Sequence, residues 1–115
     1  MKYTDYERRI ISMIGYFFLR EADSDYDLCF KMLDHMDITH LRVYKKIGKN
    51  RPDIIYITLA RPGLLIGSKG KIIKALEKHI EEETGRKSTF YIIENNIKRI
   101  LYPMTIKEAM EVGGF

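Results

Sequence analysis

Hydrophobic residues recur every three or four positions in the first third of the chain, which predicts two helices. Thr4 and Glu7 have the spacing of a capping box, and an apolar stripe follows them as far as Leu19. Ser24 and Asp27 repeat this spacing before a second helical pattern, which we expect to end near residue 36. The first stripe is wider than a helix on one surface needs, so we expect the first helix to contact two surfaces.

The hydrophobic period changes to two residues after Ile38, which predicts strands. Leu41 and Val43 alternate with arginine and tyrosine, and a second strand-like run covers 54–60 after a polar turn. A similar run at 89–93 predicts a third strand. The chain therefore changes from helical to extended structure near its first third.

The segment between the second and third predicted strands combines turn residues with helical patterns. An Arg-Pro-Gly sequence at 61–63 ends the strand, and a short apolar turn follows it. Glycines at 67 and 70 precede an amphipathic helix that we expect to end at Gly85. The tail shows a short helical pattern at Ile97, Ile100 and Leu101.

The order of predicted elements is helix, helix, strand, strand, short helix, long helix and strand, followed by a tail. This order predicts an α+β fold in which helices pack on one face of a three-stranded sheet. We divide the chain into an N-terminal helical extension at residues 1–22, a domain at 23–95 and a C-terminal tail with a short helix at 96–115.

Length and composition limit the class of protein. A chain of 115 residues has the size of one domain, and a hydrophobic content of 45% is enough for a core. Cys29 is the single cysteine, which is typical of a reducing compartment. The longest apolar run, at 10–19, is shorter than the about 20 residues that cross a bilayer, and we see no signal-peptide pattern. We expect a cytoplasmic protein with no membrane partner.

The positive charge is concentrated in the middle of the chain. The formal net charge is +4, yet residues 41–75 contain nine lysines and arginines against Asp53 alone. Such a concentration creates a local positive field that attracts polyanions such as nucleic acid. A solvated lysine face is the alternative explanation, and charge alone does not decide between the two.

Several patterns that carry chemistry in other proteins are incomplete here. The aspartates at 23–34 resemble a calcium loop, but Leu28 stands where that loop requires glycine. The three histidines fall on different predicted elements, and the phosphate loop of nucleotidases is missing. We therefore expect no catalytic residue, no metal site and no cofactor. Tyr56, Phe90 and Tyr91 have the chemistry to stack on bases, but aromatic residues of alternating strands more often lie in the core.

The glycine loop at 67–70 is the most informative segment. Two glycines at this spacing are common by chance, but here a short helix enters the loop, a longer helix leaves it, and lysines lie in and after it. Glycine lets the backbone approach a phosphate, and free N–H groups at the start of the next helix favour an anion. The predicted nucleic-acid site consists of Arg61, Ile66, Gly67, Ser68, Lys69, Gly70, Lys71, Lys74 and Arg86.

The segment from Ile57 to Gly70, ITLARPGLLIGSKG, resembles the type II KH domain of the third protein of the small ribosomal subunit. The resemblance extends upstream to Asp23 and downstream to Ile93. It implies a type II KH-like fold and a GXXG loop that clamps the backbone of about four nucleotides. It also implies an apolar groove for the bases between the helices flanking the loop and the third strand. Ser68 departs from the basic residue that is common at its position.

From the residues and this resemblance we expect a non-catalytic protein that binds single-stranded RNA. Single-stranded DNA is an alternative ligand, because the loop contacts the backbone. A second alternative is a KH fold that serves as an interaction or assembly module among ribonucleoprotein partners. The support for this alternative is the hydrophobic first helix. We expect the helix to pack within a monomer, but it also offers a surface for a homodimer at Tyr16, Phe17, Phe18 and Leu19.

Overall fold

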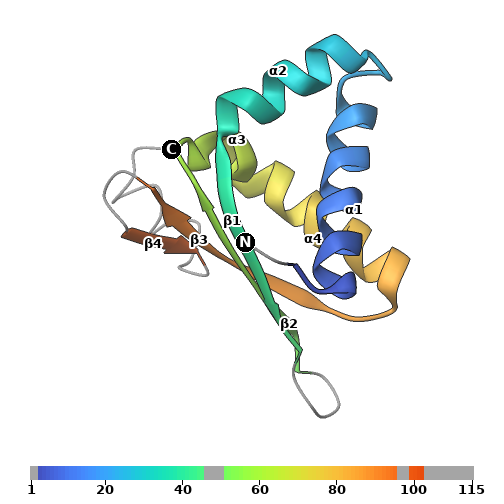
Figure 1. The fold of residues 1–115 in the computed structure, drawn as a ribbon, viewed down its shortest axis with the longest axis vertical. Coiled ribbons are helices and arrows are strands. Elements are labelled where there is room, and N and C mark those ends of the chain that lie inside the picture. The colour runs from blue at the N-terminus through green and yellow to red at the C-terminus, as the bar shows by residue number, and fades with distance from the viewer. Residues whose placement is uncertain (1–2, 46–50, 96–98, 103–115) are drawn as a thin grey trace.

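The computed structural model describes residues 3–45, 51–95 and 99–102, and within these ranges the helices lie on one face of a four-stranded sheet (Figure 1). The fold is α+β, and no described helix is long and apolar enough to cross a membrane. The elements are α1 (Asp5–Glu21), α2 (Tyr26–Met36), β1 (Ile38–Tyr44), β2 (Asp53–Leu59), α3 (Pro62–Ile66), the 3-10 turn η1 (Ser68–Gly70), α4 (Lys71–Thr84), β3 (Ser88–Glu94) and β4 (Arg99–Tyr102).

Helix α1 begins with the predicted capping box. The Thr4 hydroxyl accepts the N–H of Glu7 at 3.1 Å, and the Glu7 carboxylate accepts the N–H of Thr4 at 2.9 Å. The helix packs against α2 and also against β1 and α4, so the prediction of two contact surfaces is confirmed. Phe17 and Phe18, which supported a dimer through this helix, are buried in the core, whereas Tyr16 is 67% exposed.

The cap of α2 differs from the prediction. The carboxylate of Asp25, not the hydroxyl of Ser24, accepts the N–H of Leu28, at 3.0 Å. Ser24 has a φ of 63°, and its N–H donates to the carbonyl of Leu19, so it belongs to the turn that ends α1. The sequence pattern alone does not distinguish two adjacent residues that are both good caps.

The sheet is mixed and has the strand order β1-β2-β3-β4. Strands β1 and β2 are antiparallel, β2 and β3 are parallel, and β3 and β4 are antiparallel. Strand β2 alternates between buried and half-buried residues, so its buried set faces the helices: Asp53, Ile55, Ile57 and Leu59. The three apolar side chains of this set share one hydrophobic core with the inner faces of α1 and α4.

The tail contains a strand where the sequence predicted helical structure. Arg99–Tyr102 pairs with Ile92–Glu94 of β3, so the prediction of helical structure at Ile100 and Leu101 is wrong. The sheet therefore has four strands where the sequence predicted three. Ile97 lies outside the described residues. A few apolar positions do not form a stable helix alone, whereas pairing with the edge of β3 supplies backbone hydrogen-bond partners.

Helix α4 carries the glycine loop at its start and ends as predicted. Gly85 adopts a φ of 71° and its N–H donates to the carbonyl of Glu81, which closes the helix. Ile73, Leu76 and Ile80 are buried on one side of the helix. Burial of each such side chain contributes about 1.5 to 3 kcal/mol, so α4 is held firmly while its other side faces solvent.

Candidate nucleic-acid interface

The glycine loop turns sharply between α3 and α4. Gly67 has a φ of 76°, and a Cβ atom at this position would lie 2.6 Å from Cγ1 of Ile72. Glycine is therefore required here both by the backbone conformation and by the close approach of α4. The contact with Ile72 fixes the start of the loop against the helix that follows it.

The loop presents its two central residues to solvent. Ser68 and Lys69 are exposed, whereas Gly70 is buried and donates its N–H to the carbonyl of Gly67 at 3.1 Å. Lys69 and Gly70 both have positive φ, 55° and 75°. A left-handed lysine costs conformational energy, and such residues cluster at functional sites. The N–H of Lys71, the first residue of α4, donates to the carbonyl of Ser68, and the start of the helix carries its positive dipole end.

The remaining predicted residues divide into two groups. Lys71 and Lys74 are exposed on the first two turns of α4, directly after the loop. Ile66 is only 3% exposed and belongs to the core, so it anchors the chain directly before the loop and does not itself face a ligand. The structure thus brings Ser68, Lys69, Lys71 and Lys74 together on one surface.

Arg61 is exposed but is bound to the protein itself. Its guanidinium donates to the carbonyl of His35, and its backbone N–H donates to the carbonyl of Met36. These two bonds join the start of α3 to the end of α2. Arg61 therefore orients the helix that enters the loop, a role that its position in the sequence does not reveal.

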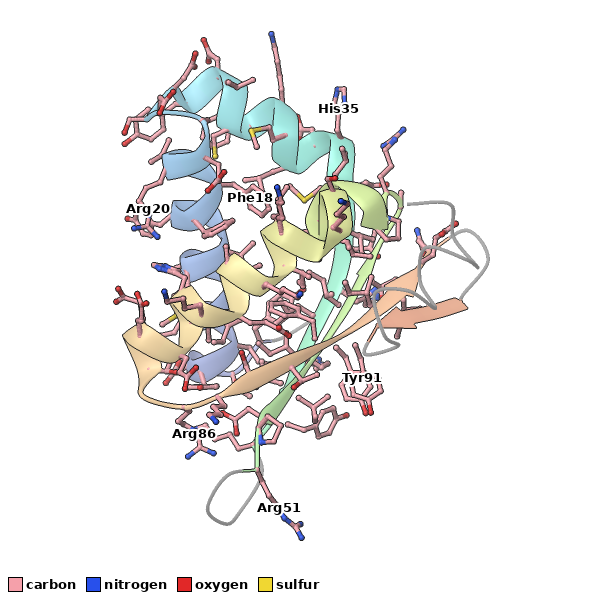
Figure 2. The ribbon with its side chains drawn as sticks, turned by 180° about the vertical axis from the view of Figure 1, so that it is seen from behind. Phe18, Arg20, His35, Arg51, Arg86 and Tyr91 are labelled. Atoms are coloured by element: carbon pink, nitrogen blue, oxygen red, sulfur yellow. The ribbon has the colours of Figure 1, made fainter. Side chains whose placement is uncertain are left out.

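Arg86 lies at the far end of α4 from the loop, roughly 20 Å away by the rise of a helix of this length (Figure 2). Its guanidinium donates to both carboxylate oxygens of Asp53, at 2.8 and 2.7 Å, and the side chain of Asp53 is only 2% exposed. These hydrogen bonds, together with the charge of Asp53, raise the pKa of Arg86 above its ordinary value. The Tyr6 hydroxyl also donates to Asp53, at 3.3 Å, and burial together with this carboxylate raises the pKa of Tyr6.

A second buried carboxylate, Glu7, holds the edge of the sheet. It accepts the N–H of Val43 and the guanidinium of Arg42, each at 2.9 Å. Burial alone would raise the pKa of Glu7, but hydrogen bonds from the Thr4 and Val43 N–H groups and the charge of Arg42 outweigh burial and lower it. Sequence reasoning missed this role and that of Asp53, because both depend on residues more than 30 positions away.

A cavity of about 340 Å³ lies between α4 and the start of β3, where the resemblance implied an apolar groove. Its lining is mainly charged and polar: Pro52, Lys74, Glu77, Lys78, Glu81, Lys87, Ser88 and Thr89. The Glu77 carboxylate accepts the N–H of Phe90 at 3.1 Å, on the edge of β3. We call this space the α4–β3 cavity, and its walls offer hydrogen bonds rather than an apolar surface.

An apolar cavity of about 390 Å³ lies on another side of the loop, between α2, α3 and α4. It is lined by Leu28, Lys31, Met32, His35, Met36, Leu64 and Ile72. The helical spacing of Leu28, Met32 and His35 was the available sequence signal for this wall. Among the described residues, no group of three histidine, cysteine or acidic side chains is placed to hold a metal ion.

Comparisons with known proteins give one informative similarity. No protein-family model matches the chain. The small ribosomal subunit protein uS3 of Thermodesulfovibrio yellowstonii is 34% identical over 62 residues, which are 54% of this chain and 27% of that protein. The matched segment thus spans about a quarter of the relative, which is the ribosomal protein whose KH domain the loop segment resembles. The fold and this similarity are consistent with a KH-like domain.

Proposed function

We propose that the protein binds single-stranded RNA without catalysing a reaction, and that the Gly67–Gly70 loop grips the RNA backbone. The observation that carries the proposal is the exposed pair Ser68 and Lys69, held in a left-handed turn at the start of a helix with two further exposed lysines. The similarity to a ribosomal protein supports RNA as the ligand.

The loop suits a phosphate for electrostatic and steric reasons. Glycine at both ends permits the positive φ values of the loop, in which Ser68 and Lys69 are left open to solvent. The dipole of α4 favours an anion at the start of this helix, and Lys69, Lys71 and Lys74 add full positive charges nearby. A phosphate bound at the loop would place the following nucleotides beside the α4–β3 cavity, because Lys74 lies next to the loop and also lines that cavity.

The polar lining of the α4–β3 cavity changes the expected form of base recognition. Lysine, glutamate and hydroxyl groups favour hydrogen bonds to base edges over burial of the bases in an apolar groove. Residues 88–90 pair with β2 on one edge of β3, and among the described residues no strand pairs with them on the other edge, which faces the cavity. We expect RNA to be favoured over DNA where a 2′-hydroxyl reaches these polar groups.

The ribosomal relative also favours a second function, assembly into a ribonucleoprotein particle. In this function the apolar cavity between α2, α3 and α4 would receive a protein side chain while the loop holds RNA. Copurification with RNase treatment separates the two functions. A protein partner that remains after RNase digestion supports assembly, and loss of all partners with the RNA supports the simple RNA binder.

The direct test of the loop replaces Ser68 and Lys69 by Asp together. This double variant puts negative charge where the phosphate is proposed to lie, so affinity for a mixed-sequence RNA should fall about 30-fold or more. Both residues are exposed, so the melting temperature should change by less than about 3 °C.

The matched control is Arg9→Asp with Ser12→Asp on α1. Both residues are exposed, and this pair of substitutions changes the net charge by the same amount as the loop variant. The affinity of the control for RNA should stay within about 3-fold of that of the parent, because salt screens the attraction between RNA and surface charges far from the site. Equal losses in the two variants would show that binding depends on overall charge and that the loop is not the clamp.

A further inference from the structure

The face of the sheet opposite the helices carries a row of tyrosines. The register of the strands places Arg42, Tyr56 and Tyr91 side by side across β1, β2 and β3. The next row contains Tyr44 and Ile54. Figure 2 shows Tyr91 pointing away from the helices. We call Tyr44, Tyr56 and Tyr91 the tyrosine face.

The three rings form one continuous aromatic surface. The rings of Tyr56 and Tyr91 are stacked, with centroids 5.0 Å apart and planes 27° apart. The ring of Tyr44 meets that of Tyr56 edge-on at 5.3 Å, and Tyr44 is 57% exposed. A hollow of about 290 Å³ lies beside them, lined by Arg42, Tyr44, Ile54 and Tyr56. The hollow and the rings leave flat apolar surface open to a ligand.

The described outward positions of this face carry no negative charge that would repel a polyanion. Among the described residues of β1, β2 and β3, the outward positions contain no carboxylate: His40, Arg42, Tyr44, Ile54, Tyr56, Thr58, Thr89, Tyr91 and Ile93. Asp53 lies two positions from buried Ile55, and Glu94 lies two positions from buried Ile92, so both fall on the side of the helices. A phosphate backbone would meet no fixed negative charge on these outward positions.

The tyrosine face adjoins the α4–β3 cavity. Thr89 lines that cavity and also lies beside Ile54 in the row next to Tyr91. Strand β4 pairs with Ile92–Glu94, and within the described part of the chain no strand lies beside the first part of β3 on that side. An RNA strand that leaves the cavity at Thr89 therefore reaches Tyr91 two positions further along β3, on the same face of the sheet.

We infer that the tyrosine face is a second RNA-contacting surface, on which bases stack after the strand has left the α4–β3 cavity. This inference rests on the proposed function of the loop. Aromatic side chains on an open sheet stack two or three bases in other RNA-binding folds, and each stacked base contributes substantially to affinity. The footprint of the protein is then about six or seven nucleotides rather than the about four of a single KH groove.

The test compares a four-nucleotide RNA with an eight-nucleotide RNA of mixed sequence. The octamer should bind at least 10-fold more tightly than the tetramer, because it alone reaches the tyrosines. Tyr44→Ala and Tyr91→Ala should each weaken octamer binding about 5-fold or more and leave tetramer binding unchanged. Tyr91→Phe keeps the ring and should keep the affinity. Tyr16→Ala is the matched control, since Tyr16 is 67% exposed on α1, away from the sheet.

A second measurement, crosslinking, tests the inference without any substitution and so does not depend on whether the variants fold. In the unaltered protein, an octamer with 4-thiouridine near its end should crosslink to Tyr91 or Tyr44 on irradiation. A crosslink confined to the loop and α4 overturns the inference. So does an octamer affinity equal to that of the tetramer, or a loss with Tyr16→Ala as large as with Tyr91→Ala. If Tyr91→Ala instead converts a self-associating protein into a monomer and leaves RNA binding intact, a second copy covers the face and the inference is wrong.

The loop variant separates failure of this inference from failure of the proposed function. If Ser68→Asp with Lys69→Asp abolishes binding of both RNAs while the tyrosine substitutions do nothing, the loop is the clamp and the tyrosine face is not used. If the tyrosine substitutions weaken octamer binding and the loop variant does not, RNA binds on the sheet and the proposed role of the loop fails.

Discussion

The lysines around the loop and the arginines elsewhere in the molecule carry the same charge but differ in their surroundings. Lys69, Lys71 and Lys74 are exposed and make no ion pair with the described residues. Arg42 and Arg86 instead bind the buried carboxylates of Glu7 and Asp53. A planar guanidinium matches a carboxylate or a carbonyl with fixed geometry, whereas a lysine ammonium stays hydrated at the end of a flexible chain.

This difference shows that a count of basic residues overstates the charge offered to a ligand. The excess at residues 41–75 pointed to a polyanion, yet Arg42 and Arg61 in that segment are bound to the protein. Lys45 is also engaged, because its ammonium lies 4.1 Å from the centre of the Tyr6 ring. The positive charge that this segment offers to a nucleic acid is therefore smaller than the sequence indicated, and the exposed lysines Lys69, Lys71 and Lys74 are part of it.

The largest expected effect is the loss of RNA affinity when the lysines beside the loop are replaced. Lys71→Met with Lys74→Met should weaken RNA binding about 10-fold at low salt and leave the melting temperature unchanged. The logarithm of affinity should also depend less steeply on the logarithm of salt concentration, by about 1.4, since each lost phosphate contact removes about 0.7. A salt titration of parent and variant checks both values. An unchanged slope would mean that these lysines contact no phosphate.

Arg86→Met should lower the stability of the protein and leave RNA binding nearly unchanged, which is the opposite of the lysine variant. It leaves the buried Asp53 without its bidentate partner, so we expect the melting temperature to fall by about 5 °C or more. Affinity for RNA, measured well below the melting temperature, should change by less than about 2-fold, because Arg86 lies far from the loop. Thermal melts and binding at a low temperature separate the two effects. Weaker binding without loss of stability would place Arg86 with the loop lysines.

The smallest effect concerns the pH dependence that Glu7 confers. Its pKa in the folded protein is lower than the ordinary value of 4.5, so the unfolded chain takes up the proton first as pH falls. The stabilising contribution of Glu7 is therefore complete above about pH 5 and is lost as pH falls through the folded pKa. Glu7→Gln should be less stable than the parent at pH 7, and the gap should narrow toward pH 3. Melts across this range check it, and a constant gap contradicts it.

The parts of the fold predicted correctly have strong local signals. The capping box of Thr4 and Glu7, the alternation of β2 and the glycine that ends α4 each act within a few residues. The loop was found in the same way, because two glycines and the following lysines are adjacent in sequence. Local patterns therefore identified the surface that we propose for the RNA backbone.

The parts that sequence reasoning missed depend on distant contacts. Asp53 and Arg86 are 33 positions apart, and nothing local shows that an arginine near the end of α4 will bind a carboxylate at the start of β2. Strand β4 forms because β3 has a free edge. Tyr56 and Tyr91 were left out of the predicted site because strand aromatics more often lie in the core. Of these two and Phe90, only Phe90 is buried, because the described helices cover one face of the sheet. Each miss required knowledge of which elements are neighbours.

The bond between Glu7 and the N–H of Val43 also protects the protein from self-association. Strand β1 is an outer strand of the sheet, and an outer strand with unpaired N–H groups is a template for a strand of another molecule. In the folded chain a carboxylate from α1 occupies one of these groups, and Arg42 holds that carboxylate in place. Protonation of Glu7 in acid would weaken this protection, so we expect the first consequence of low pH to be aggregation through β1 rather than loss of the loop that we propose for RNA.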